Sequence, residues 1–364
     1  MFNIGFKNNY KVVHVCNEFG KHVVGGAGTY MNELYKYHNE DTGFIYINYD
    51  NEDISIDDFE DNKDILVMSV EESEKLKDIN CDILVAQFYD LEPLISNSEV
   101  LANKKLVYVV HSVPTPEPMP PDNVFGGNYE LEERFIRLCE LSTVIICVSE
   151  AEKNKLSKIY PYYSDKIHVV YNGITQPNKI ILNENYKSSR KVFGYIGRTD
   201  YRKGIIEALE VIRDIDNVEL RLACPNNDNE YLREILLYIN AAKMWDKVKF
   251  CGWCMGERKQ RFFNSLDALL VPSLYEPFGY VVIEGMLKGL PIISANNGGT
   301  GEILQGYKYK YNPYKYGYFK NTLKTFIDDP NEVIAQQQEI LLDNLKRFTA
   351  KEMSDNYNKL FNEM

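Results

Sequence analysis

The stretch Leu269–Gly301, LLVPSLYEPFGYVVIEGMLKGLPIISANNGGTG, carries the most information in this sequence. It opens with a short continuous apolar run, which predicts a buried β-strand. A loop with Glu276 follows, and Gly279 then precedes the helical pattern Tyr280–Lys288, with Glu284 about one and a half turns into it. This order of strand, loop and helix is typical of an α/β domain, and the helix N-terminus offers N–H groups that suit a phosphate.

The two carboxylates of this stretch have two interpretations. In a binding site, Glu284 can accept hydrogen bonds from both hydroxyls of a ribose, and Glu276 can hold the hydroxyls of a transferred sugar. Without a ligand, Glu276 is a solvated loop carboxylate and Glu284 lies on the helix surface. The spacing alone leaves both interpretations open.

The rest of the chain repeats the alternation of apolar runs and helical patterns, which predicts parallel α/β architecture. The polar segment Asn172–Lys191 interrupts the alternation and predicts a linker. We therefore expect two Rossmann-like, doubly wound domains over residues 1–171 and 172–345, with a final helix over residues 346–364 that packs on the first domain. Two such domains bind their ligand in the cleft between them. The expected strands are Val12–Cys16, Phe44–Asn48, Ile65–Ser69, Ile83–Phe88, Leu106–His111, Val144–Ser149, Ile167–Tyr171, Val192–Gly197, Val218–Cys224, Val248–Cys251, Ala268–Pro272 and Pro291–Ala295.

Composition and charge exclude several classes of protein. The net charge of −12 argues against general binding of nucleic acid, which requires a basic surface. No apolar run approaches the roughly 18 residues of a membrane span, so no transmembrane segment is expected. The N-terminus shows no signal peptide, and we expect a cytoplasmic protein.

The cysteines fit the same location, because their number, seven, is odd and several of them lie in apolar runs. Cys251 and Cys254 form the sequence CGWC, which has the spacing of a redox motif or of half a zinc site. A structural zinc site requires a second ligand pair, and the histidines supply none at a suitable spacing. We interpret both cysteines as packing residues and expect no metal site.

The sequence EPFGYVVIE, Glu276–Glu284, resembles the Glu–seven–Glu motif of retaining glycosyltransferases of family 4, which have the GT-B fold. The resemblance covers nearly the whole chain, because further landmarks of the family occur in the expected order. They are the glycine loop Gly25–Tyr30, the strand-end histidine His111, the hinge Asn172–Gly173, the basic pair in Gly197–Arg198 and Lys203–Gly204, and Gly298–Gly299 with Glu302.

The resemblance implies a role for each matched residue. Departure of a nucleoside diphosphate develops negative charge, and without a metal the protein must supply cations. Arg198 and Lys203, five residues apart across a strand-to-helix turn, can both reach one diphosphate, although two exposed basic residues at a helix start are the alternative. The implied catalytic residues are His111, Glu276, Arg198 and Lys203. The implied donor-binding residues are Gly25, Gly26, Gly28, Arg198, Lys203, Trp253, Glu276, Phe278, Gly279 and Glu284.

Several of these assignments have a structural alternative. The glycine loop could be a tight strand–helix turn, His111 a core histidine with satisfied hydrogen bonds, and Trp253 a residue of the core rather than a neighbour of the base. His111 is followed by Ser112 where the family commonly has an acidic residue, which leaves the tautomer and orientation of the imidazole open.

Two segments are candidates for acceptor binding. Residues 114–128, PTPEPMPPDNVFGGN, form a long Pro-rich loop that is either mobile or a binding element. In Tyr307–Phe319, YKYKYNPYKYGYF, aromatic and basic residues alternate, which predicts a strand with one Tyr face or a surface for a sugar or an anionic lipid.

We therefore expect a retaining, metal-independent hexosyltransferase that needs no cofactor. It moves a sugar from a nucleotide-sugar donor, a UDP-sugar by preference, to a glycan or glycolipid acceptor, with peripheral contact at the inner face of the membrane as an option. A GT-B epimerase or phosphorylase is the alternative enzyme, and an inactive GT-B binding module is the alternative without enzymatic activity. The sequence leaves the sugar, the base, the acceptor, the linkage and the oligomeric state open.

Overall fold

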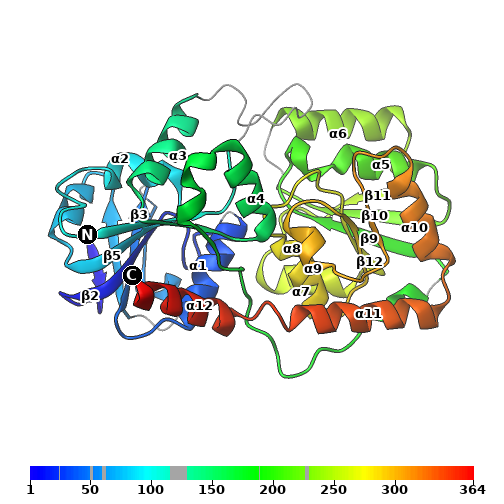
Figure 1. Ribbon diagram of the computed structural model, residues 1–364. Coiled ribbons are helices and arrows are strands. Elements are labelled where there is room, and N and C mark those ends of the chain that lie inside the picture. Colours follow the sequence, from blue (N-terminus) through cyan, green and yellow to red (C-terminus); the bar gives the residue numbers. More distant parts are fainter. Residues whose placement is uncertain (24, 50–51, 60–62, 115–128, 188, 226–228) are drawn as a thin grey trace. The chain divides into compact units, whose positions relative to one another are not determined.

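The computed structural model describes residues 1–23, 25–49, 52–59, 63–114, 129–187, 189–225 and 229–364. They divide into two compact units, Met1–Thr175 with Phe348–Met364, and Gln176–Arg347 (Figure 1). The first boundary lies after Thr175 rather than at the expected residue 171, because Thr175 is tied to the N-terminal unit. Its backbone N–H and its hydroxyl both donate to Glu33 Oε2, each at 2.6 Å.

The N-terminal unit contains an eight-stranded sheet with the order β1-β4-β3-β2-β5-β6-β7-β8. All strand pairs are parallel except β1 with β4. The strands are β1 (Phe2–Ile4), β2 (Tyr10–Cys16), β3 (Thr42–Asn48), β4 (Ile65–Ser69), β5 (Cys81–Ala86), β6 (Lys105–Val110), β7 (Val144–Cys147) and β8 (Ile167–Val169). Each expected strand of this half is present with small shifts at its ends, and only the short edge strand β1 was not expected.

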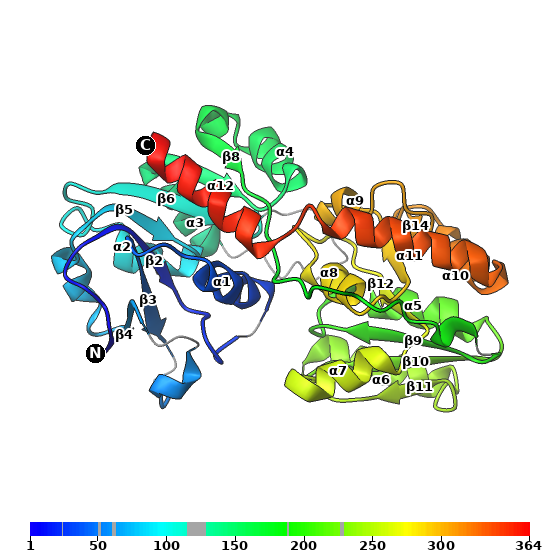
Figure 2. The same cartoon turned by 90° about the horizontal axis from the view of Figure 1, so that it is seen from below.

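Helices cover both faces of this sheet. The helices are α1 (Gly26–Lys36), α2 (Glu92–Ile95), α3 (Tyr129–Leu141), α4 (Glu150–Ile159) and α12 (Ala350–Glu363). Figure 2 shows α12 beside α1 on one face, where Ser354 Oγ donates to the carbonyl oxygen of Tyr37 at 2.8 Å. The C-terminal helix is thus part of the N-terminal unit.

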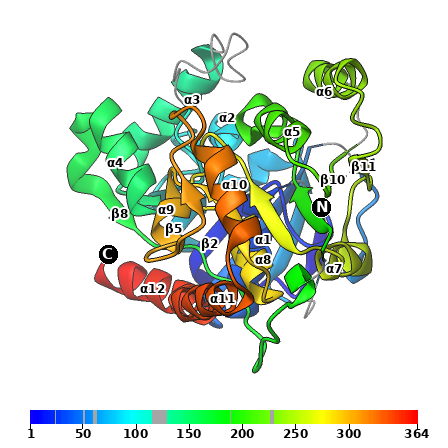
Figure 3. The same ribbon diagram turned by 90° about the vertical axis from the view of Figure 1, so that its right-hand side faces the viewer.

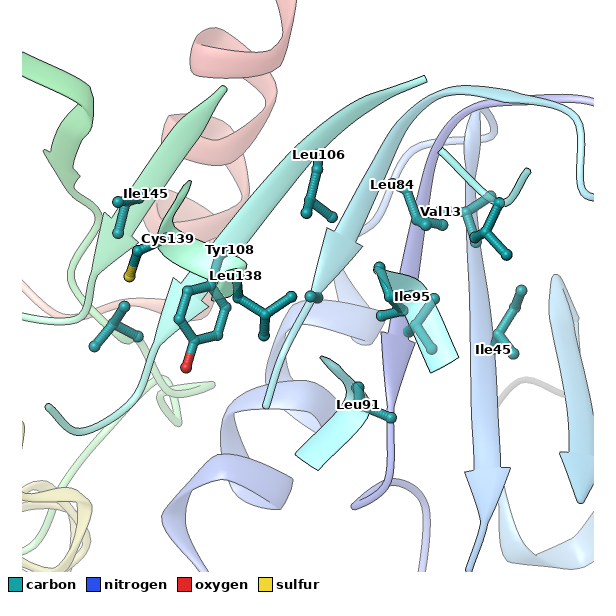
Figure 4. Packing of buried hydrophobic residues seen from close by; sticks show 14 of the residues in the cluster. Val13, Ile45, Leu84, Leu91, Ile95, Leu106, Tyr108, Leu138, Cys139 and Ile145 are labelled. Atoms are coloured by element: carbon teal, nitrogen blue, oxygen red, sulfur yellow. The ribbon is translucent and has the colours of Figure 1, made fainter. Parts of the chain in front are cut away.

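The core between the sheet and the helices α2 and α3 is closely packed with apolar side chains (Figure 4). Leu84 and Tyr108 point from β5 and β6 toward Leu91, Ile95 and Leu138 of the covering segments. Cys139 lies in the same cluster, and burial raises the pKa of its thiol well above the ordinary value. All seven cysteines are free; six are buried, and Cys251 is partly buried.

The C-terminal unit contains a parallel six-stranded sheet with the order β11-β10-β9-β12-β13-β14. Numbered from β9, this is the order 3-2-1-4-5-6 that is typical of dinucleotide-binding folds. The strands are β9 (Lys191–Ile196), β10 (Val218–Ala223), β11 (Val248–Phe250), β12 (Ala268–Val271), β13 (Ile292–Ala295) and β14 (Lys310–Tyr311). The helices are α5 (Ile205–Arg213), α6 (Glu230–Ala241), α7 (Gly256–Asn264), α8 (Tyr280–Leu287), α9 (Gly299–Ile303), α10 (Tyr318–Asp328) and α11 (Asn331–Leu345). Figure 3 shows α5 and α6 on one face of this sheet and α7 and α8 on the other.

The aromatic and basic segment Tyr307–Phe319 is only partly a strand. Tyr307, Tyr309 and Tyr311 are buried with period two around β14, as the alternation predicts. The pattern ends at Asn312, and the rings of Tyr314, Tyr316 and Tyr318 are exposed. A strand over the whole segment was therefore a wrong prediction, because only its first half has a neighbouring strand to pair with.

Among the described helices, none has the length and the apolar character that a membrane span requires. The described His, Cys, Asp and Glu residues form no group of three or more that could hold a metal ion. Of the Pro-rich loop 114–128, residues 115–128 lie outside the described part of the chain.

Candidate active site

The candidate site of the C-terminal unit lies where the strand order of its sheet reverses. β9 and β12 are neighbours in the sheet, and the chain proceeds from them toward opposite edges. Open α/β sheets bind their ligands beyond the carboxyl ends of the strands at such a switch point. Arg198 and Lys203 follow β9, and Ser273 and Glu276 follow β12, so the topology brings the expected donor-binding residues to one place.

Lys203 and Glu276 form a mostly buried ion pair at this point. Lys203 Nζ lies 2.6 Å from Glu276 Oε1, and the hydroxyl of Ser273 donates to the same oxygen at 2.7 Å. Burial by itself would raise the pKa of Glu276, but the charge of Lys203 and the hydrogen bonds from Lys203 and Ser273 outweigh it and hold the pKa below its ordinary value. Glu276 is 8% exposed and ionised, so the interpretation as a solvated loop carboxylate is wrong.

Backbone contacts fix the loop that carries Glu276. The N–H of Gly299 donates to the carbonyl oxygen of Glu276 at 2.8 Å, and the N–H of Leu274 donates to the carbonyl oxygen of Arg202 at 2.7 Å. Gly298 has a φ of 64°, and a Cβ there would lie 2.1 Å from the carbonyl oxygen of Glu276. Only glycine fits this position, which explains the glycine pair after β13.

Arg198 is not a partner of Glu276. Its side chain is half exposed, and Nη2 lies 3.5 Å from Asp200 Oδ2. Asp200, which lies between the two basic residues in the sequence, also faces Arg202, with Oδ1 3.8 Å from Nε. The first N–H groups of α5, those of Ile205 and of the next residue, donate to the hydroxyl of Tyr231 at 3.0 and 3.2 Å. The first N–H groups of α5 are therefore already bonded to a side chain, so an anion at this place would rely on the side chains of Lys203 and Arg198 rather than on the helix N-terminus.

Glu284, on α8, is paired with a lysine that no sequence motif indicated. Lys259 Nζ, on α7, lies 2.6 Å from Glu284 Oε1, and both side chains are largely buried. Glu284 is thus paired and mostly buried, against the alternative of a solvated helix-surface carboxylate, and its contact with a ribose stays a prediction. A ribose that binds Glu284 would share the carboxylate with Lys259 or use its second oxygen.

The other residues of this unit that were expected to contact the donor are Phe278, Gly279 and Trp253, and Phe278 packs against a neighbouring side chain. Phe278 is buried with its ring edge-on to Tyr280 at 5.3 Å between centroids. Gly279 precedes α8 with a φ of 108°, which strongly favours glycine. Trp253, in the loop after β11, is partly buried. It is therefore not a fully buried core residue, and its contact with the base stays a prediction.

In the N-terminal unit the strand order reverses between β2 and β5, and the glycine loop follows β2. Gly25 precedes α1, Gly26 is its first residue, and Gly28 lies in its first turn. Glu18 Oε2 accepts hydrogen bonds from the N–H groups of Gly25 at 3.0 Å and Gly28 at 3.2 Å. This carboxylate, which no sequence motif indicated, occupies the helix N-terminus at which we expected a ligand. An anionic ligand there would have to displace Glu18.

His111 follows the carboxyl end of β6, as expected. Its Nε2 lies 3.2 Å from Gln87 Oε1, and its ring is edge-on to Tyr30 and tilted against Phe88, with centroids 4.8 and 5.3 Å apart. Burial lowers the pKa of His111 to about 3, so the imidazole is neutral at physiological pH. No local pattern pointed to Gln87, because the glutamine lies 24 residues before His111, at the end of a different strand.

Two family models match this chain. Residues 178–340 match the glycosyl transferases group 1, and residues 62–176 match glycosyltransferase family 4. The chain resembles the group 1 glycosyltransferases. The resemblance first indicated by the sequence EPFGYVVIE is thereby confirmed, and it extends over parts of both units.

Curated relatives are glycosyltransferases that match part of the chain. An uncharacterized glycosyltransferase of Methanocaldococcus jannaschii is 30% identical over 200 residues, which are 50% of this chain and 50% of that protein. A probable sucrose-phosphate synthase of Thermosipho melanesiensis is 31% identical over 166 residues, 43% of this chain and 38% of that protein. The chain spans about half the length, or less, of these relatives.

Solved structures share the whole fold. The sucrose-phosphate synthase of Thermosynechococcus elongatus aligns with a TM-score of 0.81 at 15% identity, covering 98% of this chain and 99% of that chain. Anabaena HepE in complex with UDP and glucose aligns with a TM-score of 0.78 at 16% identity, covering 98% and 100%. The expected GT-B fold of two parallel α/β units is confirmed.

Proposed function

We propose that this chain is a retaining glycosyltransferase that moves a sugar from a nucleotide-sugar donor, a UDP-sugar by preference, to a glycan or glycolipid acceptor in the cytoplasm. The observation that carries the proposal is the group formed by Lys203, Glu276 and Ser273 at the switch point of the C-terminal sheet. It combines a cation for a phosphate with an ionised carboxylate for sugar hydroxyls. The complex of Anabaena HepE with UDP and glucose supports this choice of donor.

In this reaction Lys203 exchanges partners. In the free protein its ammonium group neutralises Glu276. When a diphosphate binds, Lys203 and Arg198 turn to the phosphate oxygens and compensate the charge that develops as the glycosidic bond breaks. Glu276, relieved of Lys203, then accepts hydrogen bonds from hydroxyls of the transferred sugar, and Glu284 accepts those of the ribose. The cations supply the charge compensation that a metal ion would otherwise provide.

The family resemblance supports the retaining course. In that course the departing phosphate takes the proton of the acceptor hydroxyl while the hydroxyl attacks the same face of the sugar, so that no covalent enzyme intermediate forms. Such a course needs a well-oriented diphosphate and a rigid sugar site. The loop that carries Glu276 is held by backbone hydrogen bonds and by the close approach of Gly298, which supports its role as a rigid sugar site.

A screen of UDP-, GDP- and ADP-sugars for thermal stabilisation tests the proposal. A donor at about 100 times its dissociation constant adds about 2.7 kcal/mol of stability. The same donor should give no stabilisation, or much less, with Lys203→Met, whereas Lys187→Met serves as a control on a surface lysine. Product analysis then distinguishes transfer to a glycan from epimerisation of the donor alone. Turnover should be equal in excess chelator and in Mg²⁺.

Three results would contradict the proposal. If no nucleotide sugar stabilises the protein, the site does not bind a donor. If the sugar of the donor is epimerised rather than transferred, the alternative enzyme class is correct. If turnover depends strictly on a divalent ion, Lys203 and Arg198 do not compensate the leaving-group charge.

A further inference from the structure

Gln87 lies between two histidines in the interior of the N-terminal unit. It directly follows β5 and is 1% exposed. Its amide Nε2 lies 2.8 Å from Nδ1 of His14, on β2, and its Oε1 lies 3.2 Å from Nε2 of His111, after β6. The three strands are neighbours in the order β2-β5-β6, so the sheet itself holds the amide between the two rings.

Aromatic side chains contact both imidazoles. His14 stacks on Phe44 with centroids 5.2 Å apart, and Phe361 of α12 lies edge-on to it at 6.1 Å. Tyr30 and Phe88 contact the ring of His111. These contacts restrict the rotation of both rings, and the hydrogen bonds to Gln87 decide where the protons of the two neutral rings lie.

An amide has a donating side and an accepting side, so it couples the two tautomers. The amide N–H of Gln87 donates to Nδ1 of His14, which is then unprotonated. Oε1 of Gln87 accepts from Nε2 of His111, which then carries the proton. Nδ1 of a neutral His111 is consequently a hydrogen-bond acceptor, and within the described residues no partner is assigned to it.

We propose that Gln87 is a positioning residue that holds His111 in the Nε2–H tautomer, so that Nδ1 accepts a hydrogen bond from a hydroxyl of the transferred sugar. The sugar contact rests on the proposed function, whereas the tautomer does not. Burial lowers the pKa of both histidines to about 3, which agrees with two neutral rings at physiological pH. Gln87 thereby takes the orienting role that an acidic neighbour at Ser112 could otherwise have had.

The tautomer is measurable without a donor, by ¹⁵N–¹H correlation spectra of the full chain labelled with ¹⁵N-histidine. Signals are assigned with His14→Phe and His111→Gln. We expect a protonated Nε2 and an unprotonated Nδ1 for His111, and a loss of this single state in Gln87→Met. Gln338→Met, which removes an equally buried glutamine of α11, is the matched control and should leave the spectrum of both rings unchanged. A protonated Nδ1 of His111 in the unaltered protein, or an unchanged tautomer in Gln87→Met, would overturn the proposal.

Kinetics test the consequence for the sugar, with UDP-glucose as the probe or with the nucleotide sugar that the stabilisation screen selects. Gln87→Met should lower kcat about 10- to 100-fold, the usual effect of losing an orienting partner, with little change in the dissociation constant of UDP. Gln87→Glu keeps an oxygen that can accept from Nε2–H of His111 and should recover most of the loss. An unchanged kcat in Gln87→Met, or no recovery in a folded Gln87→Glu, contradicts the positioning role. If the spectra agree but no nucleotide sugar is turned over, the tautomer assignment is supported and the proposed function fails.

Discussion

Replacing Lys203 by methionine should destabilise the C-terminal unit far more than replacing a lysine of an equally short but exposed ion pair. Lys203 Nζ and Glu276 Oε1 are 2.6 Å apart, with side chains 19% and 10% exposed. The control pair Lys187 and Glu184 has a separation of 2.7 Å with side chains 48% and 64% exposed, and it belongs to the same unit. The two pairs thus differ mainly in burial.

The expected cost follows from the charge that stays behind. Removing one partner of a buried pair costs about 3–5 kcal/mol, because the other charge is left uncompensated. We expect a value near the lower end, about 3 kcal/mol, because Ser273 still donates to Glu276. Lys187→Met should cost far less, because an ion pair between exposed side chains contributes little to stability.

The cost should also depend on pH with a defined sign. In the unaltered protein the folded-state pKa of Glu276 is below its ordinary value, so its contribution to stability is present above about pH 4.5 and is lost as the pH falls through the lowered pKa. Without Lys203, burial dominates and the folded-state pKa rises above the unfolded value. The difference in unfolding free energy between Lys203→Met and the unaltered protein should therefore widen as the pH rises from about 4.5 to neutral.

Urea denaturation at several pH values measures these differences, with Lys203→Met, Glu276→Gln and the double variant forming a double-mutant cycle. We expect a coupling of at least about 2 kcal/mol for this pair. The reasoning is refuted if Lys203→Met costs as little as Lys187→Met, or if the difference stays constant with pH.

Three further outcomes are expected. Glu284→Gln should mainly raise the donor KM and weaken binding of the nucleoside diphosphate. Glu276→Gln should bind the diphosphate almost normally and lower kcat at saturating donor. Steady-state kinetics measure KM and kcat and calorimetry measures diphosphate binding; swapped phenotypes would show that the donor binds in the opposite orientation. Burial lowers the pKa of His14 to about 3, so the unfolded chain takes up a proton first as the pH falls below about 6.5. Between pH 6 and pH 5 the unfolding free energy of the unaltered protein should thus fall about 1 kcal/mol more than that of His14→Phe, and equal falls in urea denaturation would show that His14 charges freely. Gly298→Ala places a Cβ 2.1 Å from the carbonyl oxygen of Glu276 at a φ of 64°. It should lower the unfolding free energy by about 2 kcal/mol or more. The control Gly25→Ala has open space at the Cβ and should change the melting temperature by no more than about a degree or two; a larger change would contradict the argument from space.

The alternation of elements could be predicted because each buried parallel strand leaves a continuous apolar run in the sequence. β4 was predicted to the residue, and β2 and β5 to within two residues at each end. The short edge strand β1 escaped prediction, because three residues form no period that a pattern can show. The final helix, expected over residues 346–364, begins at Ala350, because the hydroxyl of Thr349 accepts from the N–H of Glu352 and caps α12 there.

The sequence by itself determined that two parallel α/β units are present, and it placed Glu276, Glu284, Arg198, Lys203 and His111 at strand ends and helix starts, where side chains can face a ligand. Only the tertiary structure decided the partners of these residues. Lys203 meets Glu276 from 73 residues away, Glu284 meets Lys259 across 25 residues, and Glu18 and Gln87 came to the glycine loop and the histidines without any local signal. The physical reason is that a charged or polar side chain in the interior must find a partner beside it in space. The order of strands in the sheet, which local periodicity does not encode, decides which residues are beside it.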